Sequence, residues 1–337
     1  MVAHSIRYSF FFWIIQIEGA GLSSYKRVRK MRKLCLLLTA FLALNVSMAQ
    51  QTDWSEVEKI FGKKGTVQDN VFKISFPRSD LKVKIGDFSV EPSLALGSWI
   101  GMMKMGDHTM MMGDLVMLDK EVSGVISKLL AEGLEMTALH NHLIGETPTI
   151  KYIHFSGKGD AAKLAKVIKS VIETTGTPLT EQKSQNTSSP DWAKVESVLG
   201  DKGKKKWNLL QYSFPRNEKL TDSKMEMPAA MGMATGVNFQ MEGKDAGITG
   251  DFVLLADEVN PVIKMLNEHG IHVTALHNHM LFDEPRLFML HFWAVGDPDK
   301  LAKGIKAALE KTNSKKIDRS FRIAPTCQNY LKKNYQA

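Results

Sequence analysis

The sequence predicts an α+β fold that consists of two homologous repeats, each a mainly antiparallel sheet with two helices, related by a pseudo-twofold axis. Two observations predict this fold. The hexapeptide TALHNH occurs at residues 137–142 and again at 274–279, and from Gly113 onward the two halves align without a gap at an offset of 137 residues. Within each half, more segments show the two-residue alternation of strands than the periodicity of helices. Two similar halves most simply pack around a twofold axis.

The strands of each half are expected where apolar and polar residues alternate, or where a short run is continuously apolar. In the first half these segments are 71–76, 82–90, 108–118, 137–142 and 150–155, and their copies in the second half include 246–255, 274–279 and 287–292. A turn is expected at Pro148 and at Pro285. The last two strands of each half therefore form a hairpin.

Two helices are expected in each half. The first lies before TALHNH and is expected to begin at a capping Ser or Asn and to end at a Gly; these residues are Ser123 and Gly133, and in the copy Asn260 and Gly270. The second is amphipathic and follows Asp160 or Asp297, a residue type that commonly caps helices.

Composition and the repeat divide the chain into six segments. They are 1–30 (an extension produced by a start assigned too early), 31–49 (a signal peptide), 53–176 (repeat 1), 177–190 (a polar linker), 191–313 (repeat 2) and 314–337 (a basic tail).

The leader predicts export. Arg32 and Lys33 precede an apolar run at 34–44, and Ser47-Met48-Ala49 has the pattern of a cleavage site. The run is shorter than the roughly 20 residues of a membrane span, so no stable span is expected once it is removed. A membrane anchor is the competing interpretation. We expect a periplasmic or secreted protein.

Cysteine usage and charge fit this interpretation. The chain has two Cys, and Cys35 lies in the signal, so Cys327 has no partner for an internal disulfide. No Cys lies at a cleavage site after the apolar run, which argues against a lipid anchor. Seven Lys and Arg and one Glu lie in the first 50 residues, so the remainder of the chain is close to neutral and nucleic acid is not an expected partner.

The candidate site is a set of histidines with one acid in each half. Alternate residues of a strand face the same way, so the two histidines of TALHNH should share a face, and a third should meet them from the return strand. Three imidazoles and a carboxylate are ligands for Zn²⁺, Mn²⁺, Fe²⁺ or Cu²⁺. The predicted metal ligands are His140, His142, Glu146 and His154, and in the copy His277, His279, Asp283 and His291.

Other patterns leave alternatives open. The histidines could instead serve packing, and the spacing resembles a cupin motif but is one residue too long and lacks the second motif. Charged residues that persist in both halves are further candidates, for metal, for an anion or for structural pairing: Asp114, Asp251, Arg78 and Arg216. Seven Met in 102–117 indicate either core packing or, if exposed, copper handling.

The chain resembles the LppY/LpqO family, a bacterial domain of unknown function. The resemblance rests on TALHNHLIGETP in the first half and on TALHNHMLFDEPRLFMLHFW in the second, and covers nearly all of residues 53–313. It implies an exported bacterial protein without an assigned activity. Family members that are lipoproteins carry a lipidated Cys, which this chain lacks.

Three functions fit the sequence. The first is an exported protein that binds a divalent transition metal or small ligand, the second a metal-dependent exported hydrolase, and the third a non-catalytic envelope protein whose histidines are structural. The partner protein and the substrate are not specified by any motif.

Overall fold

The computed structural model describes residues 52–180 and 188–315. The described residues from Asp53 onward belong to one compact unit that contains both repeats. The predicted N-terminal extension and signal peptide, residues 181–187 of the predicted linker and residues 316–337 of the predicted tail lie outside the described residues.

Each repeat contains a six-stranded antiparallel sheet, and the two sheets have the same strand order. In the first repeat the order is β1 (Thr66–Gln68), β2 (Val71–Pro77), β5 (Gly97–Met105), β6 (His108–Leu118), β9 (Ile150–Gly159) and β7 (Glu135–His140). In the second it is β10 (Lys204–Lys206), β11 (Leu209–Pro215), β14 (Ala234–Glu242), β15 (Asp245–Leu254), β18 (Phe288–Gly296) and β16 (His272–His277). The predicted α+β fold with two repeats is confirmed.

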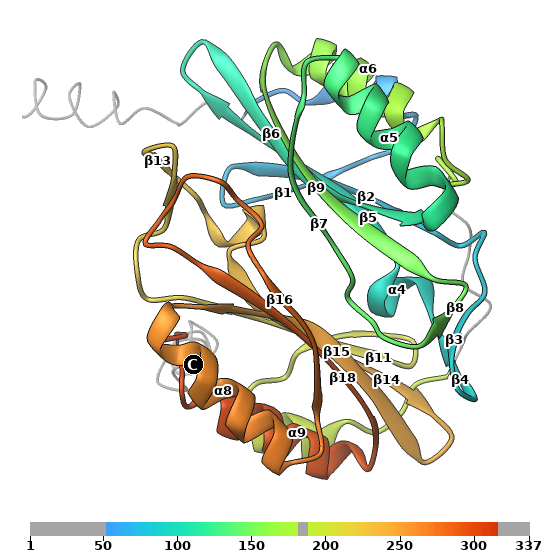
Figure 1. Ribbon diagram of the computed structural model, residues 1–337, viewed down its shortest axis with the longest axis vertical. Helices are drawn as coiled ribbons and strands as arrows, with labels where there is room; N and C mark the ends of the chain where they lie inside the picture. Colours follow the sequence, from blue (N-terminus) through green and yellow to red (C-terminus); the bar gives the residue numbers. More distant parts are fainter. Residues whose placement is uncertain (1–51, 181–187, 316–337) are drawn as a thin grey trace, which may run out of the picture. The chain divides into compact units, whose positions relative to one another are not determined.

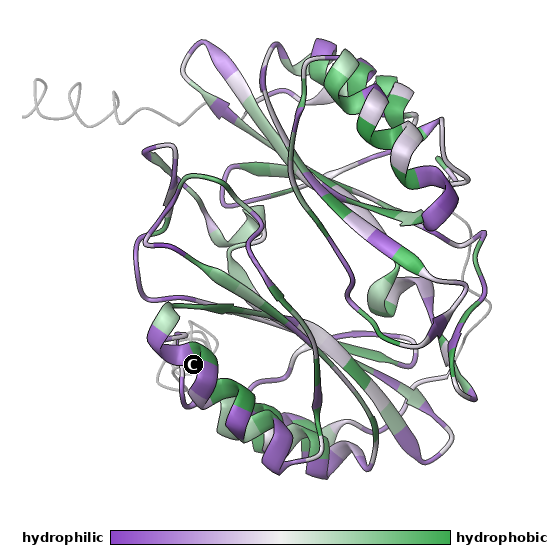
Figure 2. Cartoon of the chain, in the orientation of Figure 1, coloured by the Kyte–Doolittle hydropathy of each residue, from purple (hydrophilic) through white to green (hydrophobic). Residues whose placement is uncertain are grey.

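Helices cover one face of each sheet (Figure 1). In the first repeat they are α3 (Ser55–Phe61), α5 (Asp119–Ala131) and α6 (Ala161–Ile172), and in the second α7 (Ala193–Leu199), α8 (Ala256–Glu268) and α9 (Pro298–Leu309). Their apolar sides pack on strand residues such as Ile74 and Phe76 to form a separate core in each repeat. Figure 2 shows polar and apolar residues interspersed around these helices, as expected when only one side of a helix is buried.

The predicted helix ends are partly correct. Gly133 and Gly270 follow α5 and α8 with φ of 78° and 70°, the left-handed geometry that Gly adopts readily. The starts differ, because α5 and α8 begin before Ser123 and Asn260, so neither residue is a cap. A Glu instead accepts a hydrogen bond from the backbone N–H that precedes each helix: Glu121 from Leu118 and Glu258 from Leu255.

Each repeat also has an arm that packs on the other repeat. The arm of the first is β3 (Val83–Ile85), β4 (Phe88–Val90) and the short α4 (Pro92–Ala95), and β3 pairs with β8 (Glu146–Thr147). The arm of the second is β12 (Thr221–Asp222), β13 (Met225–Glu226) and the 3-10 helix η1 (Ala229–Met231), and β12 pairs with β17 (Asp283–Glu284).

The arms are exchanged. The Phe88 ring meets the Trp293 ring of the second repeat edge-on, with ring centroids 5.5 Å apart. In the opposite direction, Met231 is buried with Val71 and Met103 of the first repeat. This reciprocal packing is what a pseudo-twofold axis produces, and it brings the helix-free faces of the two sheets together.

Two glycines mark where strands approach too closely for a side chain. A Cβ on Gly113 would collide with the Trp99 carbonyl oxygen and with the Phe155 ring, and one on Gly250 would collide with the Gly236 carbonyl oxygen and the Phe292 ring. Each of these glycines directly precedes an Asp of the helix-free face. The close approach therefore holds that face in register.

We predict that Gly113→Ala lowers the free energy of unfolding by about 1–3 kcal/mol, since the added methyl group meets backbone that cannot move aside cheaply. The matched control is Gly124→Ala, because a Cβ at this exposed position of α5 meets nothing within 4 Å. The control should raise stability by about 0.5–1 kcal/mol. Urea denaturation measures both, and equal effects would contradict the close-contact explanation.

Candidate functional site

Only the first histidine of each TALHNH lies on a strand, whereas both were predicted to do so. Strand β7 ends at His140 and β16 ends at His277, so His142 and His279 lie in the loops that follow. A hairpin centred near Pro148 also predicts that His142 lies opposite His154, and this register is wrong. Ala138, rather than His142, pairs with His154, and a bulge interrupts the pairing between Met136 and Ala138.

Six imidazoles nevertheless form one cluster, and both repeats contribute to it. His140 stacks on His277, with ring centroids 3.7 Å apart. His142 stacks on His291 at 3.9 Å, and His154 on His279 at 3.7 Å. His140 and His277 are copies of each other, and the other two pairs are copies of one another. The pseudo-twofold axis therefore passes between His140 and His277.

Neighbouring groups orient some of the rings. The Tyr152 ring lies parallel to that of His142 at 3.5 Å, and the Tyr152 hydroxyl donates to the Ala95 carbonyl oxygen. The Thr274 hydroxyl donates to the His142 carbonyl oxygen at 2.6 Å and so joins the two repeats beside the cluster. His291 Nδ1 contacts the Gly250 carbonyl oxygen at 3.0 Å. A carbonyl only accepts, so this Nδ1 carries the proton and the Nε2 lone pair is free.

Most ring nitrogens in the cluster are buried without a hydrogen-bond partner among the described residues. Asp114 Oδ1 and Asp251 Oδ1 share this condition. The unpaired nitrogens are His140 Nε2, His142 Nε2, both nitrogens of His154, both of His277, His279 Nε2 and His291 Nε2.

The cluster contains two overlapping groups whose candidate ligand atoms all lie within 4.8 Å of one another. The first is His140 with His277, His279 and His291, and the second is His140 with His142 and His154. His140 belongs to both. The donor set thus fits one or two transition-metal ions, and the first group draws its ligands from both repeats.

The acids beside the imidazoles are not those that the spacing predicted. Glu146 accepts a hydrogen bond from the Ile150 N–H, and Asp283 accepts one from the Leu287 N–H and pairs with Arg286. Each closes the turn before β9 or β18 and belongs to neither group of imidazoles. Turn geometry explains their presence in both halves.

Asp114 and Asp251 are the acids that lie beside the imidazoles, where Glu146 and Asp283 were expected. Each pairs across the sheet with a cluster histidine, Asp114 with His154 and Asp251 with His291. Asp114 Oδ2 lies 3.7 Å from Nε2 of His142 and of His154, and Asp251 Oδ2 lies 3.8 Å from His279 Nδ1. Both were candidates from the sequence, and the structure brings both to the imidazoles.

Arg78 and Arg216 lie elsewhere and pair with acids of their own repeat. The fully buried Arg78 guanidinium contacts Asp80 at 2.9 Å and Glu121 at 2.8 Å, and it donates to the Val116 carbonyl oxygen. Arg216 repeats this arrangement with Glu218, Glu258 and the Val253 carbonyl oxygen. Every direction of each guanidinium is occupied, so the role is structural.

Burial sets the charge states of the site. Burial lowers the pKa of His140 to about 3 and of His277 to about 4, and it lowers the pKa of the other four imidazoles well below the usual range. Neighbouring histidines add to this effect at His142 and His154. Burial also raises the pKa of Asp114 and of Asp251. The imidazoles are therefore neutral, which is the form that binds metals.

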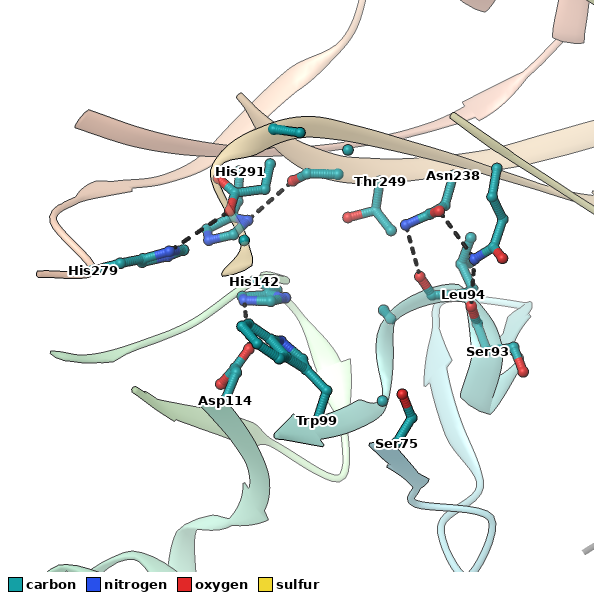
Figure 3. A pocket seen from close by; sticks show the side chains of 18 of the residues that line it. Ser75, Ser93, Leu94, Trp99, Asp114, His142, Asn238, Thr249, His279 and His291 are labelled. Atoms are coloured by element: carbon teal, nitrogen blue, oxygen red, sulfur yellow. Dashed lines mark hydrogen bonds and ion pairs between the residues drawn. The ribbon is translucent and has the colours of Figure 1, made fainter. Parts of the chain in front are cut away.

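A cavity of about 350 Å³ opens beside the cluster, between the helix-free faces of the two sheets. His142, His279 and His291 lie at one end, and Asn238, Leu94 and Ser93 at the other (Figure 3). Lys73, Trp99 and Gln211 also line it. No motif in the sequence identifies Lys73, Trp99 or Gln211 as site residues, although Lys73 and Ser75 are polar positions in the alternation of β2 and could have indicated a polar face.

The methionines serve packing, as one of the two interpretations predicted. Met102 and Met111 are buried in the core beneath the helices, and Met103, Met110 and Met112 in the contact between the repeats. Their thioethers are not exposed, which argues against copper handling at this stretch. His108 lies outside the cluster, beside Asp107.

Comparison with known proteins shows one family. The model of the family described as Domain of Unknown Function (DUF1259) matches residues 55–174 and again residues 193–311. No curated protein matches the chain. Among residues 52–180 and 188–315, no helix is both long and apolar enough to cross a membrane.

Solved structures show only slight likeness. The regulatory subunit of aspartate kinase from Thermus thermophilus is 10% identical over 63% of this chain and 95% of its own, with a TM-score of 0.19. The trimeric bacterial microcompartment shell protein PduB is 12% identical over 74% of this chain and 90% of its own, also with a TM-score of 0.19. Scores this low support no argument about fold or function.

We predict that the metal-free protein loses stability as the pH falls from 7 to 5. The six imidazoles have folded-state pKa values below the unfolded value of 6.5, so the stability they contribute is present above that pH and is lost as the pH falls. Each contributes a slope of up to about 1.4 kcal/mol per pH unit.

Asp114 and Asp251 act in the opposite direction, because their raised pKa values favour the folded state at acid pH, but they are outnumbered. Urea denaturation in the presence of a chelator, repeated across this pH range, measures the slope. His140→Gln should lower this slope by the contribution of one proton, about 1.4 kcal/mol per pH unit. A free energy of unfolding that does not change from pH 7 to 5 would show that the imidazoles are not held neutral.

Proposed function

The chain belongs to the DUF1259 family in two tandem copies, and we propose that the two copies together bind a divalent transition-metal ion through the imidazoles at their contact. The candidates are Zn²⁺, Mn²⁺, Fe²⁺ and Cu²⁺, since all accept imidazole nitrogen. The observation that carries the proposal is the row of eight buried ring nitrogens without a hydrogen-bond partner among the described residues.

Energetics favour a metal over simple packing. A buried polar atom left without a partner costs about 1–3 kcal/mol, so the cost of eight is comparable with the whole stability of an ordinary domain. The paired rings are stacked face to face, whereas N–H groups and lone pairs lie in the ring plane, so stacked partners cannot satisfy each other's nitrogens, and burial opposes protonation. A cation that accepts several lone pairs at once satisfies these nitrogens together.

Asp114 and Asp251 support the same proposal. A buried carboxylate at Asp114 and a partly buried one at Asp251, both beside neutral imidazoles, are costly unless a positive charge compensates them. A divalent ion balances two ionised aspartates. The aspartates would then act either as ligands or as acceptors that orient the imidazole N–H groups.

A metal-dependent hydrolase is the second candidate, and one observation favours it. The cavity reaches His142, His154, His279 and His291, so a substrate could approach an ion held by these residues. An ion with an open position would activate water, with Asp114 or Asp251 as the nearby base.

We also propose that the protein is exported, in accordance with the leader at 31–49 and with the resemblance to the LppY/LpqO family. The predicted cleavage after Ala49 makes Gln50 the first residue of the mature protein. Mass spectrometry of the intact protein from the envelope fraction of bacteria that express the full chain tests this. A protein that keeps residues 1–49 and stays in the cytoplasm would contradict the proposal.

We predict that untagged protein purified without chelator contains about one or two transition-metal ions per chain, as two ligand groups sharing one histidine allow. The double variant His140→Ala/His277→Ala should lower this content by at least about tenfold, because it removes ligands on the pseudo-twofold axis. Elemental analysis by mass spectrometry measures it.

The matched control is His272→Ala, since His272 is exposed on the same strand as His277 and lies outside the cluster. The control should keep the metal. Wild-type protein without stoichiometric metal after incubation with each of the four ions would contradict the proposed function. A hydrolase would in addition turn over an ester or phosphoester only with metal bound, whereas a binding protein would not.

A further inference from the structure

The cavity beside the histidines is asymmetric, although copies of one sequence form its two sides. In the first sheet the residue paired with Asp114 is Trp99, and in the second sheet the residue paired with Asp251 is Gly236. Trp99 and Gly236 therefore occupy equivalent places. One copy has the largest side chain there, and the other has none.

Trp99 fills the space on its own side. A Cβ placed on Gly101 would come within 3.2 Å of the indole and 2.9 Å of Met231 Sδ, and one placed on Gly232 would lie 3.3 Å from the indole. The equivalent space in the second copy is open, because a Cβ on Gly236 would meet nothing within 4 Å. Gly97, which also lines the cavity, is open in the same way.

The open side is lined with polar groups where the filled side has apolar ones. Asn238 pairs with Thr249 across the second sheet, whereas the equivalent pair in the first sheet is Gly101 and Met112. The Asn238 amide donates to the Leu94 carbonyl oxygen at 3.4 Å and accepts from Gln211 at 3.1 Å. These contacts fix the amides on the cavity wall (Figure 3).

Lys73 gives the cavity its positive charge. It is the only Lys or Arg among the described residues that line the cavity, and its ammonium lies 3.9 Å from the centroid of the Trp99 ring. No carboxylate of the described residues lies within salt-bridge distance of it; the acids that line the cavity are Asp114 and Asp251, at the histidine end. The indole thus holds the ammonium in place with its charge unpaired.

The charges of the occupied site sum to one positive charge. A divalent ion balances Asp114 and Asp251, the imidazoles are neutral, and the Lys73 ammonium remains. A ligand with a single negative charge would neutralise the cavity. At about 350 Å³ the cavity has the size of a site for a small molecule and not for a polymer.

We propose that the cavity binds a small organic monocarboxylate, whose carboxylate pairs with Lys73 and whose body lies in the space that Gly236 leaves open beside the metal site. This inference rests on the proposed metal binding, which supplies the charge balance. Polar groups of Asn238, Gln211 and Thr249 would contact the remaining polar atoms of the ligand.

Isothermal titration calorimetry on the metal-loaded full chain tests the inference with four probes: butyrate, benzoate, butyramide and benzamide. Each carboxylate should bind at least about tenfold more tightly than the amide of the same shape, because only the carboxylate pairs with the ammonium. Lys73→Met should abolish this preference. Lys166→Met is the matched control, since Lys166 is exposed on α6, and it should preserve the preference.

A second variant tests whether the ligand lies in the open space beside Gly236. Gly236→Leu should abolish binding of the carboxylates while the metal content stays unchanged, because the added side chain enters the cavity, where a Cβ meets nothing within 4 Å, and Gly236 is not one of the candidate ligands. Carboxylates that bind no more tightly than amides, including no binding of either, would overturn the inference, as would an unchanged preference in Lys73→Met or unchanged binding in Gly236→Leu. These outcomes would contradict only the proposed carboxylate binding. Wild-type protein without metal would instead contradict the proposed metal binding.

Discussion

The stacking of His140 on His277 is the contact on which the rest of the site depends. Copies of one residue meet only at a twofold axis, so this 3.7 Å contact fixes where the two repeats lie against each other. The other two imidazole pairs follow from the same axis, because each joins a loop histidine of one repeat to a strand histidine of the other. A single repeat offers three imidazoles, and the pair offers six around one point.

This arrangement also explains why the chain carries two copies. The helix-free face of each sheet contains buried residues such as Val71 and Met103 that one repeat alone would expose. Exchange of the arms covers this face, and Phe88 of the first repeat seals it against Trp293 of the second. The repeats therefore cannot pack together without assembling the histidine cluster. The packed state must accommodate the charge that is buried at this cluster.

Much of the fold could be predicted from the sequence, because it depends on local patterns. The alternation at 71–76 and the apolar run at 108–118 identify β2 and β6, and the repeated hexapeptide identifies the copies. The six histidines could be identified for the same reason.

Asp114 and Asp251 were candidates from the sequence, but their place beside the imidazoles could not be predicted, since the bulge after Met136 changes the register of β7 and no spacing reveals it. Glu146 has the spacing of a ligand but caps a turn, whereas Asp114 reaches the cluster from a neighbouring strand. The pairing of imidazoles between copies is likewise a property of the assembled chain.

The most direct test of the account is an anomalous difference map from crystals of protein purified without chelator, recorded at the absorption edge of the metal that copurifies. We expect a strong peak within bonding distance of His140 Nε2 and of imidazoles from residues 277–291, so that both repeats ligate one ion. A map without a peak at the cluster, with the six rings stacked and closed to any ion, would contradict it.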